Sequence, residues 1–367
     1  MQTDPTEGLS ADLPATPMLT ADLPGVGGRI KDRPEDFRVV ERPAYEPCGE
    51  GDHLYLWVEK RDLSHERLLD HVGRSLKVAR RDVGTSGMKD RRAVTRQWVS
   101  VPARVEDRVG ELDNELVRVL KTDRHGNSLK PGHLRGNDFE IIIRGVSGDA
   151  LSAAQAVLDR VAAVGCPNYF GPQRFGIDGS TLAIGEQLVS GDLKQKAIPH
   201  ARRRFLVRLG LSAVQSAVFN DVLAARLRDG LLSTVLEGDV MSFPGSRTVF
   251  IAQDLAVEQP RLNSGETVLT GPMVGVRMKG PAEPAAERER MALRARGLRT
   301  GQFEPWKGVA PGTRRPLSVR PQEVSVEAVE DGGGPGLKLS MSLPAGAYAT
   351  VVLNELMKVG VGDEPEA

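Results

Sequence analysis

Residues 84–101 read GTSGMKDRRAVTRQWVSV, a loop with two glycines that leads into a strand over residues 97–101. The same alternation of apolar and polar residues predicts further strands over 53–59, 139–144 and 337–343. Apolar residues at helical spacing predict helices over 63–79, 152–164 and 212–229. Ser212 and Gln215 have the spacing of a capping box at the start of the third helix. Because strands and helices follow no regular alternation, the sequence predicts an α+β fold with a mainly antiparallel sheet.

Composition sets limits on the class of protein. The 367 residues carry 49 Lys and Arg against 49 Asp and Glu, so the net charge gives no reason to expect a nucleic-acid partner. Cys48 and Cys166 are too few for a disulfide framework or a zinc cluster. No apolar run is long enough to span a membrane, and the first 28 residues lack the basic residues of a signal peptide. We expect a cytoplasmic, monomeric protein without a metal site.

Several catalytic motifs are incomplete. His65 and Glu66 begin an HExxH pattern, but Leu69 stands where the second zinc-binding histidine would be. The glycines over residues 25–28 lack GxGxxG spacing, and the chain has neither a P-loop nor a GxSxG motif. The sequence therefore gives no support to zinc, dinucleotide or serine-hydrolase chemistry.

Positive charge is concentrated locally. The segment Arg74–Arg96 carries a net charge of +6 over 23 residues, and a second basic stretch holds Arg202, Arg203, Arg204 and Arg208. Such clusters neutralise RNA phosphates, although from charge alone the simpler interpretation is a solvated surface balanced by acids elsewhere.

Asp90 lies inside the first basic cluster. We expect its carboxylate to be an anion because cations surround it, and an ionised carboxylate serves as a nucleophile or a base. The simpler interpretation is a turn aspartate that pairs with Arg91 or Arg92.

Aromatic residues are scarce and lie beside Gly, Pro or Asn turns. Rings at the rim of a loop stack on extruded bases, and a nearby asparagine amide reads a base edge. For Phe170 and Phe175 we favour a place in the core instead.

An ordered set of segments resembles the tRNA pseudouridine synthase D family. The segments are KDRPEDFRVVE (31–41), GMKDRRAVTRQW (87–98), GNDFEI (136–141), PNYFGPQRFG (167–176) and LPAGAYAT (343–350). The Phe219-Asn220 pair resembles that family too. The resemblance covers residues 29–357 and implies an enzyme without a cofactor that isomerises uridine, typically uridine 13 of tRNA, to pseudouridine.

The resemblance also implies the site residues. Asp90 matches the catalytic aspartate of the family, and the residues that match its uridine pocket are Phe37, Asn137 and Tyr348. Phe139 matches a position where other pseudouridine synthase families carry a tyrosine. Lys31 and Lys89 are hypothesised to hold Asp90 or a flanking phosphate.

The implied domain order places a catalytic domain at residues 29–165 and 316–367. A family-specific domain is inserted over residues 166–315, and an acidic, flexible tail covers residues 1–28. Two other functions stay open. One is a non-catalytic tRNA-binding protein or RNA chaperone, and the other is a hydrolase that pairs Asp90 with Glu35 or Asp36.

Overall fold

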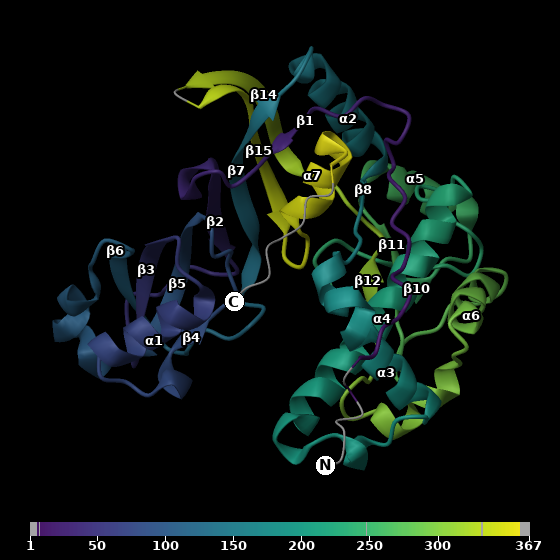
Figure 1. The fold of residues 1–367 in the computed structure, drawn as a ribbon, viewed down its shortest axis with the longest axis horizontal. Helices are drawn as coiled ribbons and strands as arrows, with labels where there is room; N and C mark the ends of the chain where they lie inside the picture. The colour runs from purple at the N-terminus through teal and green to yellow at the C-terminus, as the bar shows by residue number, and fades with distance from the viewer. Residues whose placement is uncertain (1–5, 7, 247, 332, 360–367) are drawn as a thin grey trace. The chain divides into compact units, whose positions relative to one another are not determined.

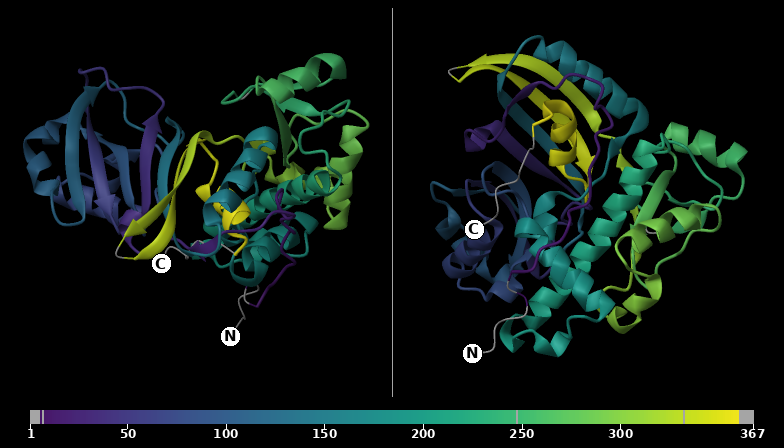
Figure 2. Two further views of the ribbon diagram at one scale, coloured as in Figure 1. Left: turned by 90° about the horizontal axis from the view of Figure 1, so that it is seen from above. Right: turned by 45° about the vertical axis from the view of Figure 1, so that its right-hand side comes forward.

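A computed structural model describes residues 6, 8–246, 248–331 and 333–359. The chain divides into two compact units, which are described separately below (Figures 1 and 2). The α-rich unit comprises residues 1–21 and 163–319, and the β-rich unit comprises residues 22–162 and 320–367. The domain boundaries expected from the family resemblance stay predictions.

The β-rich unit is built on a nine-stranded sheet with the order β14-β15-β7-β2-β5-β3-β6, in which β1 also pairs with β7 and β4 with β5. Its first strands are β1 (Gly27–Arg29), β2 (Phe37–Pro43), β3 (His53–Arg61), β4 (Gly84–Thr85) and β5 (Val94–Pro102). The others are β6 (Val117–His125), β7 (Leu134–Val146), β14 (Gln322–Asp331) and β15 (Gly334–Pro344). Among the described residues, the strand pairs of this sheet are antiparallel except for β2 with β5, which is parallel. The prediction of an α+β fold with mainly antiparallel pairing is confirmed.

The helices of this unit are α1 (His65–Ser75), α2 (Ala150–Val164), which ends at the boundary, and α7 (Ala349–Met357). Alternation in β3 points Leu54, Leu56 and Val58 to one face, where they form a core with Leu68 and Val72 of α1. We call this the inner face of the sheet. The Ser64 hydroxyl accepts a hydrogen bond from the backbone N–H of Arg67 and caps α1.

Gly136 allows an unusually close approach of two strands. A Cβ atom at this position would lie 2.1 Å from the backbone oxygen of Leu343 in β15. Because only glycine fits there, the pairing of Asn137 with Leu343 is fixed at this point of the sheet. The GNDFEI segment therefore brings Asn137 to the C-terminal end of β15.

The α-rich unit has a four-stranded sheet with the order β10-β9-β11-β12 and a separate pair of β13 with β8. Its helices are α3 (Ser180–Ser190), α4 (His200–Arg228), α5 (Leu255–Ser264) and α6 (Ala285–Ala295). Its strands are β8 (Cys166–Pro167), β9 (Val240–Ser242), β10 (Val249–Ile251), β11 (Val268–Met273), β12 (Thr313–Pro316) and β13 (Ser318–Val319). Leu9, Ala11 and Leu19 of the N-terminal segment pack, partly buried, against the core of this unit.

The helix predicted to begin at Ser212 begins twelve residues earlier, so the prediction of a capping box is wrong. Ser212 lies inside α4, where its hydroxyl accepts a hydrogen bond of 2.6 Å from Arg174, and the Gln215 amide donates to the backbone oxygen of Val274. The spacing of the two residues serves tertiary contacts. Helices α4 and α3 pack closely where Gly210 meets Gly185. A Cβ atom on Gly185 would lie only 2.1 Å from the backbone oxygen of Gly210, so this contact requires glycine.

The PNYFGPQRFG segment has a structural role in this unit. Phe170 and Phe175 are both buried, which confirms their predicted place in the core. The Asn220 amide donates to the backbone oxygen of Phe170 and accepts from its N–H, both at 2.9 Å. The guanidinium of Arg315 lies 4.2 Å from the Phe170 ring centroid.

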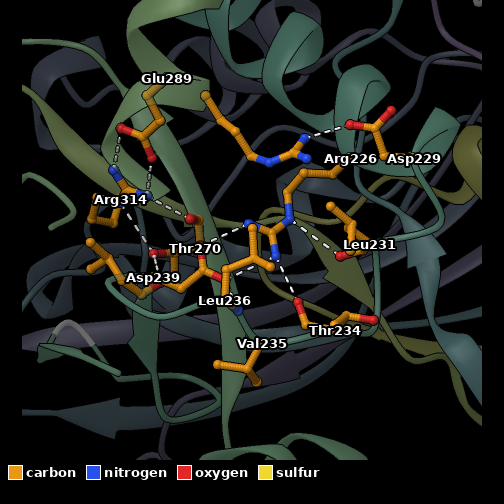
Figure 3. A network of polar contacts seen from close by, with 12 residues as sticks. Arg226, Asp229, Leu231, Thr234, Val235, Leu236, Asp239, Thr270, Glu289 and Arg314 are labelled. Atoms are coloured by element: carbon orange, nitrogen blue, oxygen red, sulfur yellow. Dashed lines mark hydrogen bonds and ion pairs between the residues drawn. The ribbon is translucent and has the colours of Figure 1, made fainter. Parts of the chain in front are cut away.

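Two buried arginines complete the α-rich unit (Figure 3). Arg226 of α4 donates to both oxygens of Asp239, at 2.7 and 2.9 Å, and to two backbone oxygens. Arg314 of β12 donates to both oxygens of Glu289 and to the hydroxyl and backbone oxygens of Thr270. Each guanidinium is bonded through all three of its nitrogens, so this network holds the unit's shape.

Within residues 6, 8–246, 248–331 and 333–359, none of the helices combines the length and hydrophobicity that a membrane crossing requires. The same residues contain no group of three or more His, Cys, Asp or Glu side chains placed to hold a metal ion.

Candidate active site

Asp90 lies in the loop between β4 and β5, and a buried lysine fixes its backbone. Lys60, at the end of β3, is fully buried, and its ammonium donates to the backbone oxygens of Leu63 at 2.6 Å and Asp90 at 2.5 Å. A buried ammonium needs such partners because desolvation of an unpaired charge is costly. Lys60 therefore ties the loop to the sheet and leaves the Asp90 carboxylate free to face another group.

That group is Lys31. Its ammonium donates to Oδ1 of Asp90 at 2.8 Å and lies 4.4 Å from the centroid of the Phe37 ring. The side chains of Lys31 and Asp90 are 18% and 35% exposed, so the pair is accessible to a ligand. The expected contact between Lys31 and Asp90 is therefore present in the structure. Lys31 itself has a left-handed backbone with φ of 61°, which is uncommon outside glycine and costs conformational energy.

Lys89 makes a different contact from the one expected. Its ammonium is 3% exposed and lies 2.9 Å from Oε2 of Glu41, whose side chain is fully buried. The hydroxyl of Ser86 donates to the same carboxylate. The buried pair therefore anchors the Asp90 loop onto β2. Within the described residues the Lys89 ammonium pairs with Glu41 and not with Asp90, and its burial keeps it away from the protein surface.

The aromatic residues expected in the site come from neighbouring strands. Phe37 of β2 and Phe139 of β7 are both buried, with ring centroids 6.2 Å apart in an edge-on arrangement. Asn137 lies two residues before Phe139 and pairs in register with Glu41. Tyr348 stands at the start of α7 with 44% of its surface exposed. Strand pairing thus gathers Phe37, Phe139 and Asn137 around one part of the inner face.

Polar atoms on this part of the inner face are buried without partners. Among the described residues, the Thr95 hydroxyl, both polar atoms of the Gln97 amide and Oδ1 of Asn137 have no hydrogen-bond partner. Thr95 and Gln97 alternate on β5 with outward-facing residues, and Thr95 pairs with Val39 and Lys60. Buried polar atoms are nearly always bonded in folded proteins. This set is therefore suited to receiving a polar ligand.

His65 starts α1 near the two buried lysines. Burial lowers the pKa of His65 to about 4, and the positive charges of Lys60, Arg80 and Lys89 add to this effect. The imidazole is therefore neutral at pH 7. In the described part of the chain, its Nδ1 is a further buried atom without a partner.

The carboxylates considered as a second acid are engaged elsewhere. Glu35 accepts a hydrogen bond from Arg61, which lowers the pKa of Glu35 below its usual value. Asp36 is buried and accepts two hydrogen bonds from Arg144, at 2.6 and 2.8 Å. The lowered pKa of Glu35 is unsuited to a general acid, and the Asp36 carboxylate is bound to Arg144, so a paired-carboxylate hydrolase has little support.

Three further residues of the site were not singled out in the sequence, namely Lys60, Glu41 and Gln97, although the last two lie in the segments quoted for the family resemblance. For Lys60 and Glu41, the alternation of buried and outward-facing positions along a strand provides a signal. Lys60 continues the buried series of Leu54, Leu56 and Val58, and Glu41 continues that of Phe37 and Val39. A charged or amide side chain is unusual at a strand position whose neighbours on the same face are buried and apolar, and such a residue indicates a functional site.

Comparisons with known proteins show which family the chain resembles. The profile of the family described as tRNA pseudouridine synthase D (TruD) matches residues 15–201 and 195–356. A tRNA pseudouridine synthase D of Anaeromyxobacter sp. (strain Fw109-5) is 44% identical over 96% of this chain and 98% of its own. One from Thermus thermophilus is 41% identical over 96% of this chain and 94% of its own. A crystal structure with the same family name, from Methanosarcina mazei, has a TM-score of 0.76 at 26% identity and covers 94% of this chain and 96% of its own.

Proposed function

Because the chain belongs to the tRNA pseudouridine synthase D family and is a tRNA pseudouridine synthase, we propose a specific target and a catalytic residue. The enzyme isomerises uridine 13 of tRNA, and the carboxylate of Asp90 carries out the reaction. The observation that carries the proposal is the accessible ion pair between Lys31 and Asp90 beside the Phe37 ring. We further propose that the β-rich unit is the catalytic domain, because it contains all the site residues predicted from the sequence.

The reaction breaks the N1–C1′ bond of uridine, forms a C5–C1′ bond, moves a proton from C5 and leaves a proton on N1. Product and substrate have the same atoms and oxidation state, so the step balances without a co-reactant. The Asp90 carboxylate attacks the sugar or the base, or abstracts a sugar proton to give a glycal. Lys31 stabilises the negative charge on that carboxylate.

The remaining residues bind and enclose the base. A uridine must leave its stack before C1′ and C5 are approachable, and the unstacking costs a few kcal/mol. Phe37, Phe139 and Tyr348 offset this cost by contact with the extruded base. Asn137 has an Oδ1 without a partner in the described structure, and this atom accepts the N3–H of uracil. Lys89 acts as a positioning residue through Glu41.

The test measures tritium release from a tRNA transcript labelled at uridine C5. The wild type releases tritium, whereas Asp90→Asn loses activity by at least about 10³-fold, the order expected when a reacting carboxylate is removed. Asp32→Asn is the matched control, because Asp32 lies in the same unit, pairs with Arg29 at 2.6 Å and is expected to retain activity. Binding of tRNA stays within about twofold in both variants.

Other outcomes separate the competing functions. A transcript with uridine 13 replaced by cytidine releases no tritium if the target is correct. Tritium release at the wild-type rate by Asp90→Asn contradicts the catalytic role of that residue. Binding without release, by wild type and variant alike, indicates a non-catalytic tRNA-binding protein. Free uracil among the products indicates a glycosidase.

A further inference from the structure

The basic stretch that precedes the core of α4 has no role in the site described above. Residues 194–208 contain six Lys and Arg and no Asp or Glu, in a chain whose net charge is zero. Lys194, Lys196, Arg204 and Arg208 are exposed, and in the described structure none of these four forms an ion pair with a carboxylate. The positive charge of these four residues is therefore not balanced by a carboxylate within the described part of the chain.

Phe205 makes this surface unusual. Phe205 is 65% exposed, although large aromatic residues are normally buried, and it lies between cations on the same helix. Arg204 and Phe205 lie four and three residues before Arg208, so these three side chains share one face of α4, and Arg202 lies three residues before Phe205. We call Lys194, Lys196, Arg202, Arg204, Phe205 and Arg208 the α4 patch.

The patch also opposes the electrostatics of its own helix. The N-terminal end of a helix carries partial positive charge and favours acidic residues. The first turn of α4 contains no acid, and no side chain caps it. Cations placed there are unfavourable for the isolated helix. A bound anion removes that penalty, because it interacts with both the side chains and the helix end.

We propose that the α4 patch is a second RNA-contact surface, at which arginines bind backbone phosphates and Phe205 stacks on an unpaired base of the substrate tRNA. This inference rests on the proposed function. Arginine guanidinium groups match the geometry of phosphate oxygens, and an exposed ring among them provides a stacking platform for a base. The combination fits an RNA loop better than an acidic protein, which offers no base to stack.

The experiment measures affinity of the full chain for an unmodified tRNA transcript at several KCl concentrations. Arg204→Gln/Arg208→Gln weakens binding about tenfold at low salt. Each lost phosphate contact lowers the slope of log Kd against log salt by about 0.7 to 0.9, so the slope falls by about 1.4 to 1.8. Phe205→Ala weakens binding about tenfold without changing the slope, because stacking releases no counterion. The kcat at saturating tRNA stays within about twofold.

The matched control is Arg228→Gln/Arg277→Gln, which removes two exposed arginines of the same unit that form no ion pair within the described residues. Its affinity and slope match the wild type. Thermal unfolding checks that Phe205→Ala is folded. We expect its melting temperature to be close to that of the wild type, because an exposed ring contributes little to stability.

The outcomes distinguish two kinds of failure. In the first, the wild type binds tRNA and forms pseudouridine, and the patch variants bind tRNA with wild-type affinity. This outcome overturns the patch proposal alone. Equal losses in patch and control variants also overturn it, because they show a general charge effect. A wild type that neither binds nor modifies tRNA overturns the proposed function, and the patch proposal with it.

Discussion

One buried network from each unit shows two ways in which buried charge is organised. In the α-rich unit, Arg226 and Arg314 each bond a carboxylate through two nitrogens and bond backbone oxygens as well (Figure 3). In the β-rich unit, the buried Lys89–Glu41 pair adjoins buried atoms of Gln97 and Asn137 that have no partner among the described residues. A network that satisfies itself holds a shape. A network that leaves polar atoms without partners is prepared for a ligand.

The largest effect on stability is expected from breaking the fully hydrogen-bonded network of the α-rich unit. Arg226→Met leaves Asp239 buried and unpaired, which costs about 3 to 5 kcal/mol of unfolding free energy. The melting temperature of the α-rich unit falls by about 10 °C. Thermal unfolding followed by circular dichroism measures the change, and the activity of the folded fraction stays unchanged.

Asp229→Asn is the control within the same network (Figure 3). Asp229 accepts a hydrogen bond of 2.6 Å from Arg288, but its side chain is half exposed, so its loss costs less than about 1 kcal/mol. If Arg226→Met unfolds at the same temperature as Asp229→Asn, the buried network does not hold the unit.

A smaller effect on stability and a selective effect on activity are expected from a change in the candidate active site of the β-rich unit. Lys31→Ala removes the ammonium next to Asp90 and lowers kcat by about 10²-fold, the order found when one preorganised charged group is lost. The pair is partly exposed, so the unfolding free energy changes by less than about 1 kcal/mol. Single-turnover kinetics with saturating tRNA measures the first quantity, and denaturant unfolding the second.

Arg29→Ala removes an equal charge two residues away, from an exposed pair with Asp32, and retains activity. A loss of tRNA affinity in Lys31→Ala without a fall in kcat would instead assign Lys31 to a flanking phosphate.

The smallest effect concerns a pair at the edge of the β-rich unit. Hydrogen bonds from Arg144 and from the backbone of Gly333 lower the pKa of Asp331 to about 2, from an ordinary value of 3.8. A lowered carboxyl pKa stabilises the folded state above about pH 4, and this contribution disappears as the pH falls to about 2. Asp331→Asn therefore unfolds more readily than the wild type at pH 5, and the difference closes toward pH 2.

Acid titration of the wild type and of Asp331→Asn, followed by fluorescence, measures this difference. We expect a shift of about 0.3 pH unit in the unfolding midpoint. Glu330→Gln, one residue away on the same strand, shows none. A difference that grows toward pH 2 would contradict the assigned direction of the pKa shift.

Much of the fold was predictable because local patterns agree with tertiary packing. The alternation over His53 to Glu59 correctly predicted β3 and its buried Leu54, Leu56 and Val58. The helix over α4 was placed correctly in part, but its start was wrong, because Ser212 and Gln215 had the spacing of a cap and make tertiary contacts instead.

The sequence by itself determined the family resemblance, the fold class and the place of Asp90 in a basic loop, because all three depend on the type and order of residues. Only the tertiary structure decided that Lys31 pairs with Asp90 across 59 positions and that Lys89 turns to Glu41. Sheet register and burial decide such pairings, and they join residues that are distant in the sequence. A charged side chain does not indicate its partner until the strands have been aligned.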